Sequence, residues 1–171
     1  MELDTWDLEL YSLIVKTNQN VKFPNVDSSW KIGIVFSTYY EDEINSLVEC
    51  AKETLIEAGI TSDQISLHPV TGSFEVPLIG AALANAKEAD ALIGFGIIVQ
   101  GETEHAGHVA RETARGIMDV QTQYRIPFAY EVLHVNSLKE AQDRCGKGNN
   151  KGKEAACTVL HSLAELQSMQ S

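Results

Sequence analysis

The sequence predicts an α/β fold in which helices cover both faces of a four-stranded parallel sheet, a three-layer αβα sandwich. Four apolar segments suited to buried strands alternate with segments whose apolar residues recur at helical spacing. This alternation implies parallel pairing through right-handed crossovers. A chain of 171 residues fits one domain with a core large enough to fold without a metal or a disulfide.

The first half of the domain begins at Lys31. Residues 31–37 form a short apolar run, typical of a strand buried on both faces. The apolar residues from Ile44 to Ile56 are spaced as on a helix that Gly59 ends. Residues 64–70 predict the second strand. Pro77 then begins the second helix, because proline is tolerated in a first helical turn.

The second half starts with residues 91–99, the most apolar strand in the sequence. A polar loop over 101–107 follows, and the apolar residues from Val109 to Met118 predict the next helix. The fourth strand covers 128–135. Two helices complete the domain, over about 137–144 and 151–167, with a loop over 145–150 between them.

We predict that residues 1–30 are an N-terminal arm and that residues 31–171 are the domain. Residues 8–15 have the pattern of a strand or a short helix, and turn-forming residues follow them. Such an arm either packs on a neighbouring subunit or is a frayed terminus.

The composition argues against several classes of partner. Thirteen Lys and Arg against 24 Asp and Glu leave a formal net charge of −11. We therefore expect no nucleic-acid or membrane partner, since phosphate surfaces attract clustered cations, although a local pocket for one small anion is compatible with this charge. Three cysteines without a close pair disfavour a disulfide framework or a thiolate zinc site. Without a signal peptide or a membrane-spanning apolar run, we expect a cytoplasmic protein.

Polar loops follow the predicted strands, and ligands of open parallel sheets bind beyond the carboxyl ends of the strands. The four segments at these ends are STYY, TGSFE, QGETEH and HVNS. TGSFE combines small residues, whose backbone a ligand can approach, with a ring and a carboxylate. An aromatic ring here is either packing or, if the ligand is planar, a stacking surface.

Residues 101–108, GETEHAGH, carry the most chemical groups. The N–H groups of residues 102–105 lie at the predicted start of a helix, which suits a phosphate. The alternative is a helix cap with Thr103 as the capping hydroxyl and no ligand. His105 or His108 could transfer protons near neutral pH, or either could be a surface histidine without a role. The pair has no evident third metal ligand, so we predict no metal.

Three cations, Arg144, Lys147 and Lys151, lie around a glycine-containing loop in an otherwise acidic chain. A guanidinium can bind phosphate through two hydrogen bonds. Alternatively, these side chains are solvated at a corner between two helices, where they complement a helix C-terminus.

Four motifs together resemble the 6,7-dimethyl-8-ribityllumazine synthase family over about residues 31–166. They are GIV in the first strand, V-x-GSFE-x-P, G-x-x-x-x-G-x-T-x-H-x-x-x-V, and R-x-G followed by NKG-x-E-A-A. The resemblance implies a flavodoxin-like strand order and a homo-oligomer, either a pentamer or an icosahedral shell built from pentamers. It also implies condensation of 5-amino-6-ribitylamino-uracil with 3,4-dihydroxy-2-butanone 4-phosphate, two small-molecule substrates, without a cofactor. Riboflavin synthase is a further candidate partner.

The resemblance assigns roles to individual residues. His105 matches the family's proton-transferring histidine, and Glu154 matches the acidic residue that supports it. The implied substrate-binding residues are Gly101, Glu102 and Thr103 at the phosphate, Gly72, Ser73, Phe74 and Glu75 at the ribityl chain, Tyr39, Ile97 and Ile98 at the heterocycle, Tyr130 and Arg144 across the subunit interface, and Lys151 near the site.

The sequence departs from the family pattern at four places: Thr38-Tyr39-Tyr40 for Arg-[Phe/Trp]-Asn, Gln100 for an arginine, Ala106-Gly107 for an aromatic pair and Glu131 for a glycine. A carboxylate at Glu131 would oppose a bound phosphate nearby. The alternatives to an active enzyme are therefore a diverged flavin or lumazine binder, or a shell protein on the same scaffold. A flavodoxin-like FMN carrier is disfavoured, because the loop after the first strand lacks a Ser/Thr-rich phosphate cradle.

Overall fold

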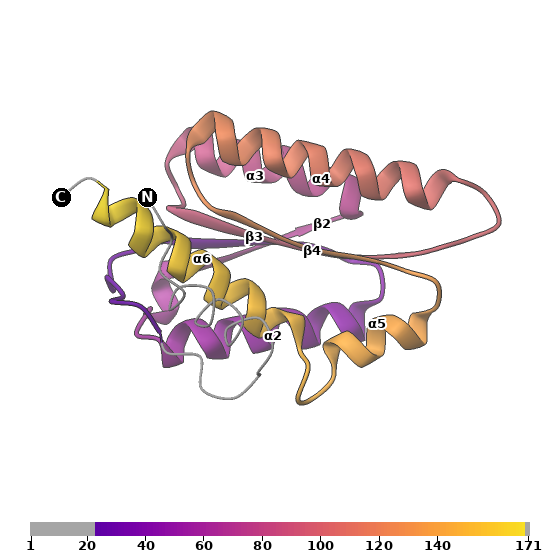
Figure 1. The fold of residues 1–171 in the computed structure, drawn as a ribbon, viewed down its shortest axis with the longest axis horizontal. Coiled ribbons are helices and arrows are strands. Elements are labelled where there is room, and N and C mark those ends of the chain that lie inside the picture. The colour runs from indigo at the N-terminus through magenta and orange to yellow at the C-terminus, as the bar shows by residue number, and fades with distance from the viewer. Residues whose placement is uncertain (1–22, 170–171) are drawn as a thin grey trace, which may run out of the picture.

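The computed structural model describes residues 23–169 and has the predicted three layers, with helices on both faces of one sheet (Figure 1). The sheet has four parallel strands in the order β2-β1-β3-β4, which confirms the flavodoxin-like arrangement. Because β1 and β3 are central, their side chains are covered on both faces, in keeping with their apolar sequences.

The strands are β1 (Ile32–Ser37), β2 (Ile65–Val70), β3 (Ala91–Val99) and β4 (Phe128–Val135). The helices are α2 (Glu41–Glu57), α3 (Val76–Ala86), α4 (His105–Tyr124), α5 (Leu138–Cys145) and α6 (Lys151–Ser168), with short 3-10 helices η1 (Ser62–Gln64) and η2 (Ser73–Glu75). The strand predictions agree with these bounds to within one residue at either end.

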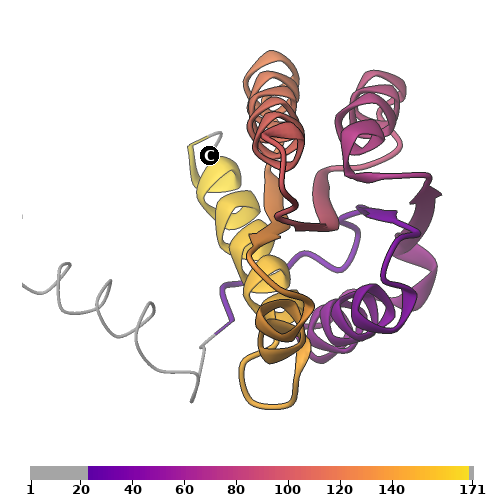
Figure 2. The ribbon, with the colours of Figure 1, turned by 90° about the vertical axis from the view of Figure 1, so that its right-hand side faces the viewer.

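Two apolar cores lie on the two faces of the sheet. Helices α3 and α4 lie side by side on one face, and α2, α5 and α6 cover the other (Figures 1 and 2). Alternate residues of β3 enter opposite cores, with Leu92 on the α3/α4 side and Ile93 on the α2/α6 side. Burial of apolar side chains from both faces therefore holds the strand ends in fixed positions.

Local signals explain where several elements end. Gly59 has φ 108°, the left-handed conformation expected just after a helix, and it follows α2 as predicted. Residues 73–75, expected to be a loop, instead form η2, which continues directly into α3. Pro77 lies in the first turn of α3 rather than at its first residue, where its missing N–H is still harmless.

The chain immediately before β1 packs against the α2/α6 core. Trp30 is buried, and Phe23 and Val26 are partly buried against the same cluster. The first 22 residues of the predicted arm, including the strand or helix expected over 8–15, lie outside the described residues. Within residues 23–169, no helix is both long and apolar enough to cross a bilayer.

Candidate active site

The loops after β1 and β2 meet at the carboxyl edge of the sheet. The N–H of Thr38 donates to the carbonyl of Val70 at 2.9 Å and ties the two strand ends together. A Cβ added to Gly72 would lie 3.2 Å from Glu75 Oε2 and 3.9 Å from Tyr39 Cε2. The structure therefore brings together Tyr39, Gly72 and Glu75, three of the residues that the sequence nominated.

Two aromatic rings at this edge are open to solvent, since Tyr39 is 63% and Phe74 is 58% exposed. An exposed ring contributes little to the core of its own protomer, so both are free to cover a planar ligand or a second protomer. Tyr40, the next residue, starts α2 with φ 57°, a conformation uncommon for a side chain of its size.

Ser73 is the buried residue of this loop. Its hydroxyl occupies the space that a Cβ at Gly96 would fill, only 2.2 Å away. Thr113 in α4 donates from its hydroxyl to the carbonyl of Ser73 at 3.3 Å. Because Ser73 is anchored to β3 and α4, the loop has a fixed height above the sheet.

The end of β3 presents mainly backbone to the site. The side chain of Ile97 is 4% exposed and belongs to the α2/α6 core, while Ile98 is partly buried against the other core. Any contact of these two residues with a ligand at the edge would therefore have to come largely from main-chain atoms.

The predicted phosphate loop is exposed and leads directly into α4. Gly101, Glu102 and Thr103 are solvent-accessible, and His105 is the first residue of the helix. Glu104, rather than Thr103, occupies the cap position, and the Thr103 hydroxyl accepts from the N–H of His105 at 3.4 Å. The unpaired N–H groups at the start of this 20-residue helix give the loop a partial positive charge suited to an anion.

His108, the second histidine of this segment, contacts neighbouring side chains. His108 Nδ1 lies 3.0 Å from Arg111 Nη2, and its Nε2 lies 3.7 Å from a Glu104 carboxylate oxygen. Within residues 23–169, no group of three His, Cys, Asp or Glu side chains could hold a metal ion.

A second group of predicted residues lies on helices of the other face. Arg144, in the last turn of α5, donates from Nη1 to the carbonyl of Glu140 at 2.7 Å. Lys151 Nζ lies 2.5 Å from Glu154 Oε2 within the first turn of α6. This first turn is acidic at Glu154, as the positive end of the helix dipole favours.

Glu131 lies beside this second group. It has the same orientation on β4 as Ala129 and Leu133, which enter the α2/α6 core. Burial raises its pKa to about 7; Lys151 lowers this pKa and Glu154 raises it further. Burial, reinforced by Glu131, also raises the pKa of Tyr130. At pH 7 about half of the Glu131 carboxyl groups would then be neutral, and a neutral carboxyl group does not repel an anion.

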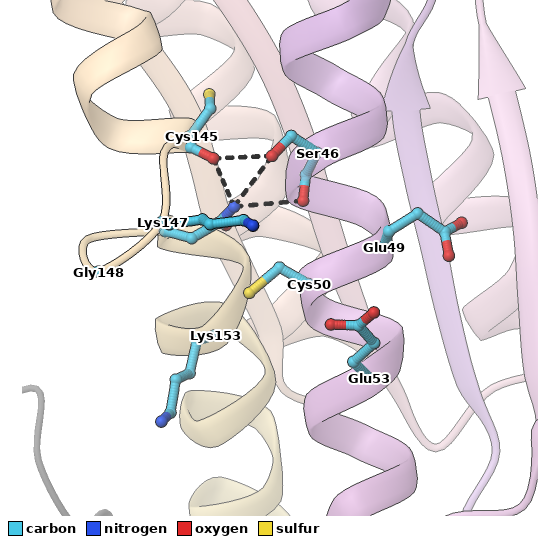
Figure 3. Close-up of a pocket in the computed structure, with 9 residues that line it drawn as sticks. Ser46, Glu49, Cys50, Glu53, Cys145, Lys147, Gly148 and Lys153 are labelled. Carbon is cyan, nitrogen blue, oxygen red and sulfur yellow. Dashed lines mark hydrogen bonds between the residues drawn. The ribbon is translucent and has the colours of Figure 1, made fainter.

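The loop between α5 and α6 holds the second group in place. Asn150 caps α6 by accepting from the N–H of Gly152 at 2.8 Å, and its Nδ2 donates to the carbonyl of Cys145 at 2.6 Å. Ser46 in α2 donates to the same carbonyl at 2.7 Å. Figure 3 shows the bonds to the Cys145 carbonyl at one end of a pocket that Cys50 also lines. Arg144 and Lys151 are thus at fixed positions on either side of the loop.

The residues at the strand edge and the second group, Arg144, Lys151 and Glu154, do not meet within one protomer. His105 begins a helix on one face of the sheet, whereas Glu154 belongs to a helix on the opposite face (Figure 1). Tyr130 lies in the middle of the edge strand β4, five residues before its last residue, Val135. Among the described residues, no hydrogen bond or ion pair joins His105 or the 101–103 loop to Arg144, Lys151 or Glu154.

Sequence reasoning missed the side chains that support the site. Thr113 lies forty residues from Ser73 in sequence, and its bond to that residue has no local signal. Gln100 contacts the 101–103 loop and His134 contacts Gln100, but neither residue was assigned a role from the sequence, although Gln100 was noted as a departure from the family pattern.

This fold and edge define a class: a three-layer α/β protein with a polar ligand site beyond the carboxyl ends of its parallel strands, beside a helix N-terminus. The sequence model of the family described as 6,7-dimethyl-8-ribityllumazine synthase matches residues 29–167. A protein named 6,7-dimethyl-8-ribityllumazine synthase from Ruthia magnifica subsp. Calyptogena magnifica is 35% identical over 148 residues, which cover 82% of this chain and 88% of that protein. The chain belongs to the 6,7-dimethyl-8-ribityllumazine synthase family.

Proposed function

We propose that this protein is a transferase that condenses 5-amino-6-ribitylamino-uracil with 3,4-dihydroxy-2-butanone 4-phosphate to 6,7-dimethyl-8-ribityllumazine, in riboflavin biosynthesis. The observation that carries the proposal is the arrangement at the strand edge, where His105 and the start of α4 follow the same edge as Tyr39 and the 72–75 loop. Membership of the family supports it and does not favour a non-catalytic binder.

Each part of the edge suits one part of the substrates. The exposed ring of Tyr39 offers a stacking surface to the pyrimidine. The 72–75 loop, anchored through Ser73, offers polar groups to the ribityl chain. The N–H groups at residues 101–105 offer hydrogen bonds and a favourable dipole to the phosphate.

The chemistry requires positioning and proton transfer rather than a cofactor. The substrate amine adds to the ketone and loses water to form an imine. Phosphate then leaves, and the ribityl-bearing nitrogen closes the ring with loss of a second water. His105, exposed at the start of α4, is placed to move protons in these steps. Holding two substrates together supplies a large share of the acceleration.

We further propose that the complete site lies between two protomers of a pentamer. Arg144, Lys151, Glu154 and Tyr130 lie apart from His105 within one chain, so they can serve the same reaction only from a neighbour. From there, Arg144 would bind the phosphate and Glu154 would support His105. Cyclic symmetry gives every protomer both roles, because each chain completes the site of the next.

The experiment is a steady-state assay of lumazine absorbance with the wild type, His105→Gln and the matched control His108→Gln. We expect His105→Gln to lower kcat by about tenfold to a hundredfold, since positioning survives without proton transfer. His108→Gln should retain wild-type kcat. Equal rates for all three proteins would remove His105 from the chemistry.

A further inference from the structure

The 101–103 loop is tied to the sheet by a side chain that no predicted role uses. The N–H of Gln100 donates to the carbonyl of Val135 at 2.8 Å, which extends the β3–β4 ladder by one residue. Its side chain then turns forward, and Nε2 donates to the carbonyls of Gly101 at 2.8 Å and Thr103 at 3.0 Å. Both amide hydrogens are therefore used to fold the loop back on the strand end.

The third member of this network is His134 on the neighbouring strand. Its Nε2 lies 3.0 Å from Gln100 Oε1. The opposite orientation of the amide would place its oxygen against two carbonyl oxygens, so the orientation with Nε2 toward the loop is the stable one. The amide oxygen can only accept, and His134 must therefore donate from Nε2.

We propose that Gln100, oriented by His134, is the positioning residue that holds the 101–103 loop in its anion-binding conformation. The proposal rests on the function proposed above, since that function makes the loop a phosphate site. Gly101 has open space around it, and the loop is exposed, so packing alone does not order it. Without the amide, the loop would have to be ordered when the phosphate binds, and the affinity would fall.

A neutral amide acts on the anion differently from a cation. Gln100 adds no charge to the site, so its effect on phosphate affinity should not depend on ionic strength. Arg144, in contrast, would act through its charge, and salt would screen its contribution. Salt dependence therefore separates a positioning residue from a direct ligand.

The first experiment measures the affinity for inorganic phosphate by calorimetry for the wild type, Gln100→Ala, His134→Ala and the double variant. Gln123→Ala, an exposed glutamine of α4, is the matched control. We expect Gln100→Ala to weaken binding by about five- to tenfold, equally at low and high salt. The double variant should bind no more weakly than Gln100→Ala, because His134 acts only through the amide. Wild-type affinity in Gln100→Ala, or additive losses in the double variant, would overturn the proposal.

The second experiment does not depend on phosphate or turnover. Amide hydrogen exchange over residues 101–105 should be faster in Gln100→Ala and His134→Ala than in the wild type and in Gln123→Ala. His134 is exposed, so its replacement leaves the fold intact. Unchanged exchange in both variants would refute the positioning role even if the enzyme were active. Faster exchange in both variants, together with a wild-type protein that shows no turnover, would instead refute the proposed function alone.

Discussion

The side chain of Arg144, the proposed phosphate ligand, is held by its own helix. Its Nη1 donates to the carbonyl of Glu140 one turn earlier, which fixes the guanidinium near the end of α5 and leaves further N–H donors available. A lysine could keep the charge but not the planar set of donors. The residue is therefore suited to a phosphate approaching from a neighbouring protomer.

Arg144→Lys should raise KM for the butanone phosphate by about tenfold and leave KM for the pyrimidine unchanged, because only two-point recognition of the phosphate is lost. Steady-state kinetics with one substrate saturating measure each KM. Lys147→Ala, in the adjacent loop, controls for a simple loss of positive charge. An unaltered KM for the phosphate substrate in Arg144→Lys would contradict the assignment.

Glu131 makes the free energy of unfolding of the protein depend on pH. Its pKa is raised from 4.5 to about 7 in the folded state, so folding takes up a proton between these values. Stability from this group is therefore highest below pH 4.5 and declines as pH rises to about 7, above which the penalty of a buried charge is complete.

Glu131→Gln should raise the free energy of unfolding by about 1–3 kcal/mol at pH 8 and change it much less at pH 5. Urea unfolding at the two pH values measures this difference. Glu88→Gln, at an exposed position, is the matched control. A destabilised Glu131→Gln variant at pH 8 would mean that the charged form is favoured in the fold.

At the scale of elements, the junction of α2, α5 and α6 depends on one amide. Asn150 caps α6 through Oδ1, and its Nδ2 donates to the carbonyls of Cys145 and Ser46. The two functions can be separated, because serine can cap a helix but cannot reach both carbonyls.

Asn150→Ala should lower the free energy of unfolding by about 2 kcal/mol, and Asn150→Ser by about half of that, as it keeps the cap. Chemical denaturation of the two variants measures how much of the stabilisation comes from the cap and how much from the bridge. Asn149→Ala, at the exposed neighbouring position, is the control. Equal losses in both Asn150 variants would show that the bridge, and not the cap, provides the stabilisation.

The sequence predicted the elements well where a single physical rule decided them. Apolar runs such as residues 91–99 defined the strands, and Gly59 defined the end of α2. η2 was missed because its residues are typical of a turn, and its position depends on the space above Gly96. The Gln100–His134 pair was also missed because it depends on tertiary structure. The pairing of β3 with β4 brings the two residues together.

At the scale of the whole molecule, the net charge of −11 contrasts with the cations of the site. In the proposed pentamer this charge would be repeated in each protomer and would favour solubility. In the proposed shared site, Arg144 and Lys151 would form a local exception that is used only through contact between protomers.

A shared site predicts that two impaired variants can partly restore each other's activity. Co-expressed His105→Gln and Arg144→Ala chains should form mixed oligomers in which about a quarter of the sites are intact. Activity above that of either variant alone, measured on the purified mixture, is the expected result. Separately purified variants that cannot exchange subunits are the control. If the mixed oligomers recovered no activity, His105 and Arg144 of one chain would have to act in the same site.

The most direct test is the initial rate of 6,7-dimethyl-8-ribityllumazine formation by the wild-type protein with both substrates, followed together with phosphate release. The account predicts a rate well above the spontaneous reaction, one phosphate released for each lumazine formed, and no release when the pyrimidine is omitted. A rate equal to that without protein would contradict it.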